Sequence, residues 1–204
     1  MTDVDHKSEN IRKEESRVDR SSREAKFGQQ AVTLWLTGLS CSGKSTIARA
    51  LEHRLFELGR RVYWLDGDNV RFGLSSDLGF SQEDRAENIR RIAEVSQLFN
   101  DAGCIVISSF ISPYREDRIK ARKIVGDDNF FEIYIATPIE VCEERDIKGL
   151  YKKARAGEIS GFTGVDDPYE PPAAPKLTIN TSGREVSECV DDILVMLNEK
   201  GVFS

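Results

Sequence analysis

The chain has 204 residues, a length that suits one α/β domain with a sizeable core. Charged residues make up 31% and the net charge is −6, which argues against bulk attraction to nucleic acid or to an anionic membrane. No apolar run is longer than a strand and no secretory signal is evident, so neither a membrane-spanning nor a secreted protein is expected.

The first part of the chain differs in composition from the rest. Residues 1–28 are highly charged and almost devoid of large apolar side chains. Such a segment buries too little apolar surface to fold alone. We therefore predict an N-terminal arm over residues 1–28, flexible or ordered against a partner subunit, and a folded domain over residues 29–204.

A phosphate-binding motif follows the first predicted strand. Val32–Leu36 is apolar and of strand length, residues 38–45 read GLSCSGKS, and a helical pattern continues to Leu58. This order of strand, G-x-x-x-x-G-K-[ST] loop and helix predicts a nucleoside triphosphate site rather than an ordinary glycine turn. Lys44 would reach the β- and γ-phosphates, and the Ser45 hydroxyl would ligate Mg²⁺. The nucleotide-binding residues predicted are Gly38, Leu39, Ser40, Cys41, Ser42, Gly43, Lys44, Ser45 and Thr46.

The remaining elements alternate between strands and helices. A capping box at Ser81–Asp84 begins a long helix that is predicted to end near Asp101. Alternation of this kind predicts a mainly parallel, five-stranded sheet covered by helices on both faces, a three-layer α/β sandwich. The other predicted strands are 62–65, 104–110, 130–136 and 177–180. Further helices are predicted over 150–156 and 186–197, and another is predicted to end at Val125. A helix could also start at Pro138.

Two carboxylates come directly after the second predicted strand. Asp66 and Asp68 would lie at the carboxyl edge of the sheet, where ligands bind in open α/β folds. They could bind Mg²⁺ through water or accept a proton from an attacking hydroxyl, although a polar β-turn is the alternative. Arg71 and Arg85 flank the glycine-rich stretch that follows and are candidates for binding an anionic second substrate.

Two loop phenylalanines and one basic segment are further candidates. Phe80 and Phe162 each lie beside a glycine, and either pack in small satellite cores or stack on a purine ring. The basic run from Lys148 to Arg155 precedes a glycine-rich stretch. It is either a solvated helix face or part of a lid that closes over phosphates. We define the lid as residues 148–164 and predict that it is mobile.

Several motifs in order give the chain a resemblance to a known family. The segments GLSCSGKST, DGDNVR-x-GL-x-x-DLGF, RAENIRRI, FISPYR and KGLYKKARAGEISGFTG together resemble adenylylsulfate kinase (APS kinase) over roughly residues 31–197. Members of this family have a P-loop kinase fold. They transfer the γ-phosphoryl group of ATP to the 3′-hydroxyl of adenosine 5′-phosphosulfate (APS), giving PAPS and ADP. The resemblance implies sulfate activation, Mg²⁺ as cofactor and a homodimer.

The resemblance also implies roles for individual residues. Asp66 would organise Mg²⁺ and the reacting hydroxyl beside Lys44, and Ser112 matches the serine that the family describes as a phosphoserine intermediate. Because a bound hydroxyl can attack in line without a covalent intermediate, Ser112 as a pocket-lining residue is the alternative. The APS-binding positions implied are Asp68, Arg71, Phe80, Arg85, Asn88, Ile111, Ser112, Lys148, Gly161 and Phe162.

The chain departs from the family's pattern at two positions, and other nucleotide-binding proteins are rival interpretations. Cys41 replaces the glycine or alanine usual in the family's phosphate loop, and Ser75 stands where asparagine is common. A GTPase is disfavoured because no Asn-Lys-x-Asp element occurs, whereas a nucleoside or nucleotide kinase would share fold and donor but not acceptor. Four cysteines without metal spacing indicate free thiols and a cytoplasmic protein.

Overall fold

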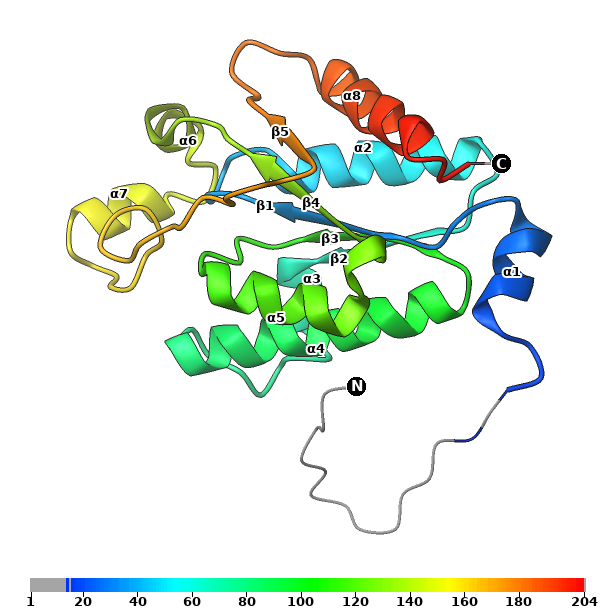
Figure 1. The fold of residues 1–204 in the computed structure, drawn as a ribbon. Coiled ribbons are helices and arrows are strands. Elements are labelled where there is room, and N and C mark those ends of the chain that lie inside the picture. Colours follow the sequence, from blue (N-terminus) through cyan, green and yellow to red (C-terminus); the bar gives the residue numbers. More distant parts are fainter. Residues whose placement is uncertain (1–13, 15, 204) are drawn as a thin grey trace.

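The computed structural model describes residue 14 and residues 16–203, and it has a parallel β-sheet at its centre (Figure 1). The order of the five strands is β2-β3-β1-β4-β5, and every neighbouring pair is parallel. Strand β1 is buried at each of its positions because it has a neighbour on both sides and helices over both faces. The strands are β1 Thr33–Thr37, β2 Val62–Asp66, β3 Ile105–Ser109, β4 Phe130–Ile135 and β5 Leu177–Ile179.

Helices cover both faces of the sheet, so the predicted three-layer sandwich of the P-loop kinase type is confirmed (Figure 1). On one face, α2 Lys44–Glu57 and α8 Val186–Glu199 pack on a core that includes Leu34, Leu51 and Ile193. On the other face, α4 Gln82–Asp101 and α5 Arg115–Val125 pack on a core centred on Trp35. The short helices are α1 Arg20–Phe27, α3 Gly67–Arg71, α6 Ile139–Arg145, α7 Leu150–Arg155 and the 3₁₀ turn Asp127–Asn129.

The strand order places the phosphate loop at the functional edge of the sheet. The chain leaves the carboxyl end of β1, which is the central strand: β3 and then β2 lie on one side of it, and β4 and then β5 on the other. Ligands of open α/β sheets bind at such a switch point. Helix α2 starts at Lys44 directly after the loop, so the helix N-terminus faces the same edge.

Helix α1 lies in the segment predicted to be a flexible or partner-bound arm, and in this structure it docks on the domain of its own chain. Asp19 caps it by accepting from the Ser22 backbone N–H at 2.8 Å, and the Arg61 guanidinium lies 3.5 Å from the centre of the Phe27 ring. These contacts sit at the amino ends of β2 and β3, away from the phosphate loop. They are polar and cation–π contacts, which hydrophobic periodicity does not reveal. Residues 1–13 and 15 of the predicted arm lie outside the described residues.

Candidate active site

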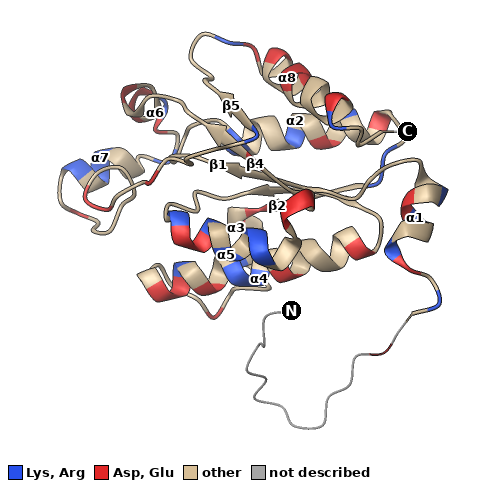
Figure 2. Ribbon diagram, viewed as in Figure 1, with Lys and Arg blue, Asp and Glu red and all other residues tan. Residues whose placement is uncertain are grey.

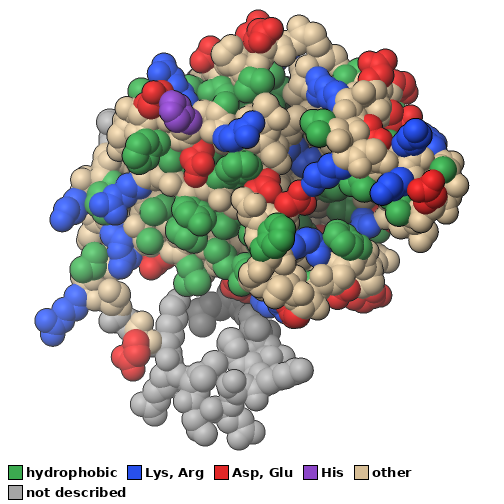
Figure 3. Space-filling view, turned by 180° about the vertical axis from the view of Figure 1, so that it is seen from behind, with side chains coloured by type: hydrophobic (Ala, Val, Ile, Leu, Met, Phe, Trp, Pro, Cys, Tyr) green, Lys and Arg blue, Asp and Glu red, His purple; other side chains and the backbone are tan. Residues whose placement is uncertain are grey.

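A large pocket opens at the carboxyl edge of the sheet. It has a volume of about 1130 Å³ and is lined by the phosphate loop, by residues that follow β2 and β3, by the start of α4 and by the lid. Figure 3 shows the molecule hollowed on this side, with Lys and Arg side chains gathered in and around the hollow. Figure 2 shows that basic side chains are also concentrated on α7, which belongs to the lid. The pocket therefore has basic side chains at its rim (Figure 2 and Figure 3).

The phosphate loop, Gly38–Ser45, has the backbone that its glycines allow. A Cβ at Gly38 would lie 2.5 Å from the carbonyl oxygen of Ile135, so only glycine fits there. Gly43 caps α2 with a φ of 105°. Cys41 adopts a φ of 58°, a left-handed conformation that is unusual for a residue with a side chain, and it lines the pocket. A glycine at this position would carry no such strain.

Lys44 is buried at the first position of α2. Its Nζ donates to the carbonyl oxygens of Gly38 at 2.9 Å and Leu39 at 2.6 Å, so the ammonium is held against the phosphate loop. Burial lowers the pKa of Lys44 from 10.5 to about 8. A phosphate in the loop would supply the negative charge that this environment lacks.

Asp66, the last residue of β2, connects the phosphate loop to the end of β3. Its Oδ2 accepts from the Ser45 hydroxyl at 2.9 Å and from the Ser109 hydroxyl at 3.2 Å, while its Oδ1 caps α3 by accepting from the Asp68 N–H at 3.0 Å. No group of three or more His, Cys, Asp or Glu side chains able to hold a metal occurs among the described residues. One hydroxyl and one carboxylate nevertheless fit Mg²⁺, which commonly takes only one or two protein ligands beside substrate phosphates.

An ion pair joins the lid to the edge of the sheet. Lys148 Nζ donates to the carboxylate of Asp68, and this hydrogen bond raises the pKa of Lys148. Both side chains are more than half exposed and both line the pocket. In this arrangement Lys148 is paired with the protein rather than free for an anionic substrate.

The two arginines nominated from the sequence both lie in the pocket. Arg71 Nη1 donates to the Gly79 carbonyl at 2.8 Å, and its guanidinium lies 4.4 Å from the centre of the Phe80 ring. Arg85 Nη1 donates to Thr163 Oγ1 at 2.9 Å and pairs with Asp167 at 3.1 Å. Burial, reinforced by the charge of Arg85, lowers the pKa of Arg71. The pocket therefore concentrates positive charge where an anion is expected.

The two loop phenylalanines both line the pocket. Phe80 is 72% exposed, so it is not part of a satellite core. Phe162 packs edge-on against Tyr151, with ring centres 4.9 Å apart, and its backbone N–H donates to Asp166 at 2.7 Å. Gly161 donates to the same carboxylate at 2.7 Å. The lid has its own hydrogen bonds and is an ordered element in this structure.

Ser112 lies in the loop after β3, residues 110–113, which we call the acceptor loop. It is 2% exposed, and its backbone has a φ of 39°. Its Oγ accepts from Trp35 Nε1 at 3.1 Å and donates to the Phe110 carbonyl at 3.4 Å. Neither of these partners can act as a base toward the hydroxyl.

Asn88 and Ile111 also line the pocket, as the resemblance implies. Asn88 is buried on α4, and its Oδ1 has no hydrogen-bond partner among the described residues. A buried polar atom without a partner costs free energy, so a ligand that donates to this oxygen would bind more tightly. All ten APS-binding positions implied by the sequence meet in this one pocket.

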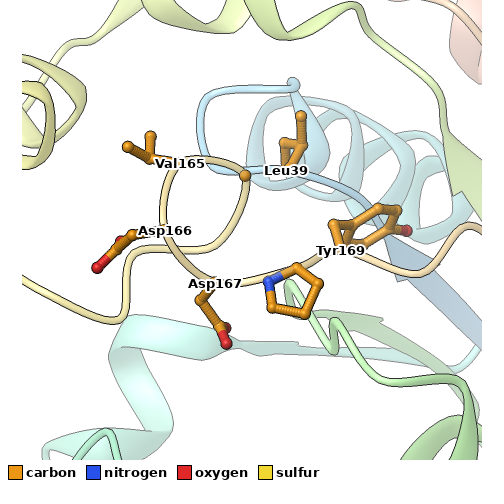
Figure 4. A pocket seen from close by; sticks show the side chains of 7 residues that line it. Leu39, Val165, Asp166, Asp167 and Tyr169 are labelled. Atoms are coloured by element: carbon orange, nitrogen blue, oxygen red, sulfur yellow. The ribbon is translucent and has the colours of Figure 1, made fainter.

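Three residues of the predicted nucleotide site do not line the large pocket: Gly38, Leu39 and Ser42. Gly38 and Ser42 pack inside the domain instead. Gly38 lies against the Ile135 carbonyl, and the Ser42 carbonyl accepts from Thr137 at 2.8 Å and from Thr181 at 3.0 Å. Leu39 instead faces a second, shallow pocket of about 510 Å³, together with Val165, Asp166, Asp167 and Tyr169 (Figure 4). The Leu39 side chain thus meets the end of the lid rather than the large pocket.

One end of the pocket was not predicted from the sequence. Arg145, Thr181, Arg184 and Val186 line it on the side of β4 and β5, and Arg145 Nη1 donates to Thr181 Oγ1 at 2.8 Å. These residues carry no motif of their own. Their position after β4 and β5, at the edge that holds the phosphate loop, is the signal that could have found them.

Comparison with known proteins gives a consistent result. A model of the family described as adenylylsulphate kinase matches residues 30–180. The adenylyl-sulfate kinases of Clostridium kluyveri and Clostridium acetobutylicum are 57% and 55% identical, over 95% and 97% of this chain and 97% and 98% of theirs. The solved structure of a Mycobacterium tuberculosis APS kinase in complex with AMPPNP and APS is 48% identical, with a TM-score of 0.80, and the match covers 83% of this chain and 99% of that one.

Proposed function

The chain belongs to the adenylylsulphate kinase family, and on that premise we infer that it transfers the γ-phosphoryl group of ATP to the 3′-hydroxyl of APS, giving PAPS and ADP. ATP is the co-substrate and APS the acceptor. The observation that carries this inference is one continuous pocket that holds both the phosphate loop and the whole set of acceptor positions. Such a kinase serves sulfate assimilation.

The strand order suggests where each substrate lies. The phosphate loop follows the central strand β1, and the pocket extends from it in two directions. Toward β4 and β5, Arg145, Thr181 and Arg184 would receive the nucleoside of ATP. Toward β2 and β3, Phe80, Arg85 and Asn88 would receive APS. The γ-phosphoryl group then lies between them, next to Lys44 and Asp66.

Catalysis of phosphoryl transfer consists mainly of positioning and charge stabilisation. The backbone N–H groups of the phosphate loop and the N-terminus of α2 would hold the ATP phosphates, with Lys44 directed at the transferring group. Ser45 and Asp66 would hold Mg²⁺, which when bound neutralises charge on the phosphates. Asp66 would also accept a hydrogen bond from the 3′-hydroxyl of APS and orient it.

We assign acceptor recognition to the basic and aromatic residues of the pocket. Arg71 and Arg85 present guanidinium groups that match phosphate and sulfate oxygens. Phe80 and Phe162 offer ring faces for the adenine of APS, and Lys148 would leave Asp68 for the anionic acceptor as the lid, residues 148–164, closes. Closure excludes water, which would otherwise compete with the 3′-hydroxyl for the γ-phosphoryl group.

For Ser112 we propose a pocket-lining role. Its hydroxyl is occupied by Trp35 and by the Phe110 carbonyl, and no base is bonded to it. The 3′-hydroxyl of APS would therefore attack ATP directly, without a phosphoserine intermediate.

We also propose a cytoplasmic homodimer. Strand β2 lies at the edge of the sheet, and its exposed Tyr63 stacks on Phe99 of α4 with ring centres 4.8 Å apart, next to the exposed Leu98. Such exposed apolar surface is typical of a subunit contact. All four cysteines are free thiols, as expected in a reducing compartment. No helix among the described residues is long and apolar enough to cross a membrane.

Product analysis tests the proposed reaction. Incubation of the enzyme with ATP, Mg²⁺ and APS should give a 3′-phosphorylated product of APS in mass spectra, in an amount equal to the ADP formed. Lys44→Ala should fold and form neither product, because the charge directed at the transferring phosphoryl group is lost. ADP formed without any phosphorylated APS would show that water, not APS, is the acceptor.

A further inference from the structure

One buried arginine outside the proposed site ties the acceptor loop to the rest of the molecule. Arg118 lies on α5, and its side chain is 2% exposed. Its guanidinium makes four hydrogen bonds: Nε to Glu132 Oε1 at 2.8 Å, Nη1 to the carbonyls of Ser112 at 2.6 Å and Pro113 at 3.1 Å, and Nη2 to the carbonyl of Glu170 at 2.6 Å. Neither the pocket nor the sequence motifs include this residue.

The two carbonyls bound by Nη1 belong to a strained part of the backbone. Ser112 has a φ of 39°, and among the other described residues that are not glycine only Cys41, with a φ of 58°, is also in the left-handed region. Such a conformation persists only where its surroundings fix it. The Thr37 hydroxyl donates to the carbonyl of Ile111 at 2.7 Å, and Arg118 donates to the carbonyls of Ser112 and Pro113. The strain therefore places Ile111 and Ser112 in the pocket at a set position.

The remaining bond of Arg118 reaches the segment that follows the lid. The Glu170 backbone N–H donates to the Pro113 carbonyl at 2.9 Å, and its carboxylate accepts from the Arg115 N–H at 2.7 Å. Beside it, Tyr169 shares a hydrogen bond with Thr37 at 3.0 Å. One guanidinium thus joins the acceptor loop and the C-terminal anchor of the lid, residues 167–171.

Glu132 of β4 fixes the orientation of the guanidinium. It is nearly buried and also accepts from Arg122 Nη2 at 3.1 Å through its other oxygen. A lysine could keep the charge near Glu132, but its single nitrogen lacks the planar fork that reaches three carbonyls and a carboxylate together. Arg122 touches neither the acceptor loop nor the lid anchor through any hydrogen bond in the described part of the chain.

We propose that Arg118 is a positioning residue for the acceptor: it holds the acceptor loop and the lid anchor in one geometry, and through them it sets the affinity for APS. It touches no substrate, and none of its hydrogen bonds reaches the nucleotide side of the pocket. The proposal rests on the proposed function for its kinetic part, and on the hydrogen bonds alone for its structural part.

The test compares Arg118→Lys with the matched variant Arg122→Lys. In Arg118→Lys we expect the KM for APS to rise about tenfold or more, because hydrogen bonds from a charged donor to buried carbonyls are lost. The affinity for ADP, measured by calorimetry, should stay within about twofold of wild type. Arg122→Lys should change neither quantity, although it alters the same carboxylate.

Hydrogen exchange supplies a readout that does not need turnover. Amides of residues 110–114 and 167–171 should exchange faster together in Arg118→Lys and remain as in wild type in Arg122→Lys. If Arg118→Lys does not fold, Glu132→Gln keeps the shape of the side chain but removes the charge that holds the guanidinium, and it should shift both readouts in the same direction. A wild-type KM for APS with unchanged exchange in both segments would overturn the proposal, even if the melting temperature fell. Absence of APS turnover in the wild type would instead contradict the proposed function.

Discussion

The Ser109 hydroxyl donates a hydrogen bond to Asp66 Oδ2 over 3.2 Å, and its direction is fixed by a third residue. Trp64 Nε1 donates to Ser109 Oγ at 2.8 Å. Because an indole N–H can only donate, it occupies an acceptor site of Ser109 and directs the hydroxyl proton at Asp66. Neighbouring strands β2 and β3 thereby orient the carboxylate that we place between ATP and APS.

Ser109→Ala removes this contact without disturbing the outline of the site. We expect kcat to fall by about fivefold to tenfold, the effect of one hydrogen bond of about 1 kcal/mol, with little change in either KM. Ser108→Ala is the matched control, since Ser108 is also buried but bonds to Ser96 on the other side of the strand. Equal losses in the two variants would show that packing, not orientation of Asp66, is responsible.

The lowered pKa of Lys44 predicts a pH dependence of nucleotide binding. Burial brings this pKa to about 8, and bound phosphates would raise it again because they favour the ammonium. Below pH 8 Lys44 already carries its proton, so binding takes up none. Above pH 8 binding must protonate the amine, and the affinity for ADP should fall by up to about tenfold per pH unit.

Calorimetry from pH 7 to pH 9.5, in buffers of different ionisation enthalpy, measures both the affinity and the proton uptake. Lys44→Arg provides the control, because a guanidinium stays charged throughout and its weaker binding should not depend on pH in this range. An affinity of the wild type that is constant up to pH 9.5, without proton uptake, would refute the assignment.

The role of Ser112 can be tested by its removal. Ser112→Ala leaves the Trp35 indole N–H without its acceptor, so we expect a modest loss, with turnover within about tenfold of wild type. No phosphoenzyme should accumulate when the wild type is incubated with labelled ATP alone. Isolation of a phosphoserine that is converted into PAPS on addition of APS would establish the covalent route instead.

Lid closure should be visible by hydrogen exchange. In this structure the Lys148–Asp68 pair and the Arg85–Thr163 hydrogen bond both link the lid to the rest of the domain, and the exposed Lys148–Asp68 pair contributes little stability. We expect the amides of residues 150–162 to exchange quickly in the free enzyme and much more slowly with ADP and APS bound, while α8 stays unchanged. Equal protection of residues 150–162 in both states would indicate a static loop.

The sequence predicted the fold well where hydrophobic periodicity is strong. The five strands and helices α2, α4, α5 and α8 begin and end within a few residues of the predicted positions. Helix α3 was read as loop because it has only five residues and no apolar stripe; it forms because the Asp66 carboxylate caps it. Helix α1 was not predicted for a related reason: contacts of arginine side chains, rather than buried apolar side chains, hold it against the domain.

The candidate site shows the same division. Residues within contiguous motifs, such as Asp68, Arg85 and Phe162, were found because spacing along the chain identifies them. The end of the pocket near β4 and β5, and Arg118, were missed because the fold alone assembles them from separate elements. Leu39 was included because it lies inside the motif, although its side chain faces the lid anchor (Figure 4). Spacing specifies the loop backbone but not the direction of each side chain.

The acceptor preference tests the central claim most directly. A coupled assay of ADP release should compare APS, AMP and adenosine as acceptors at matched concentrations of ATP and Mg²⁺. We predict that kcat/KM for APS exceeds that for AMP by about a hundredfold or more, because Arg71 and Arg85 offer charged donors that a lone phosphate cannot fully satisfy. Equal kcat/KM for APS and AMP would contradict an adenylylsulfate kinase and indicate a general nucleotide kinase.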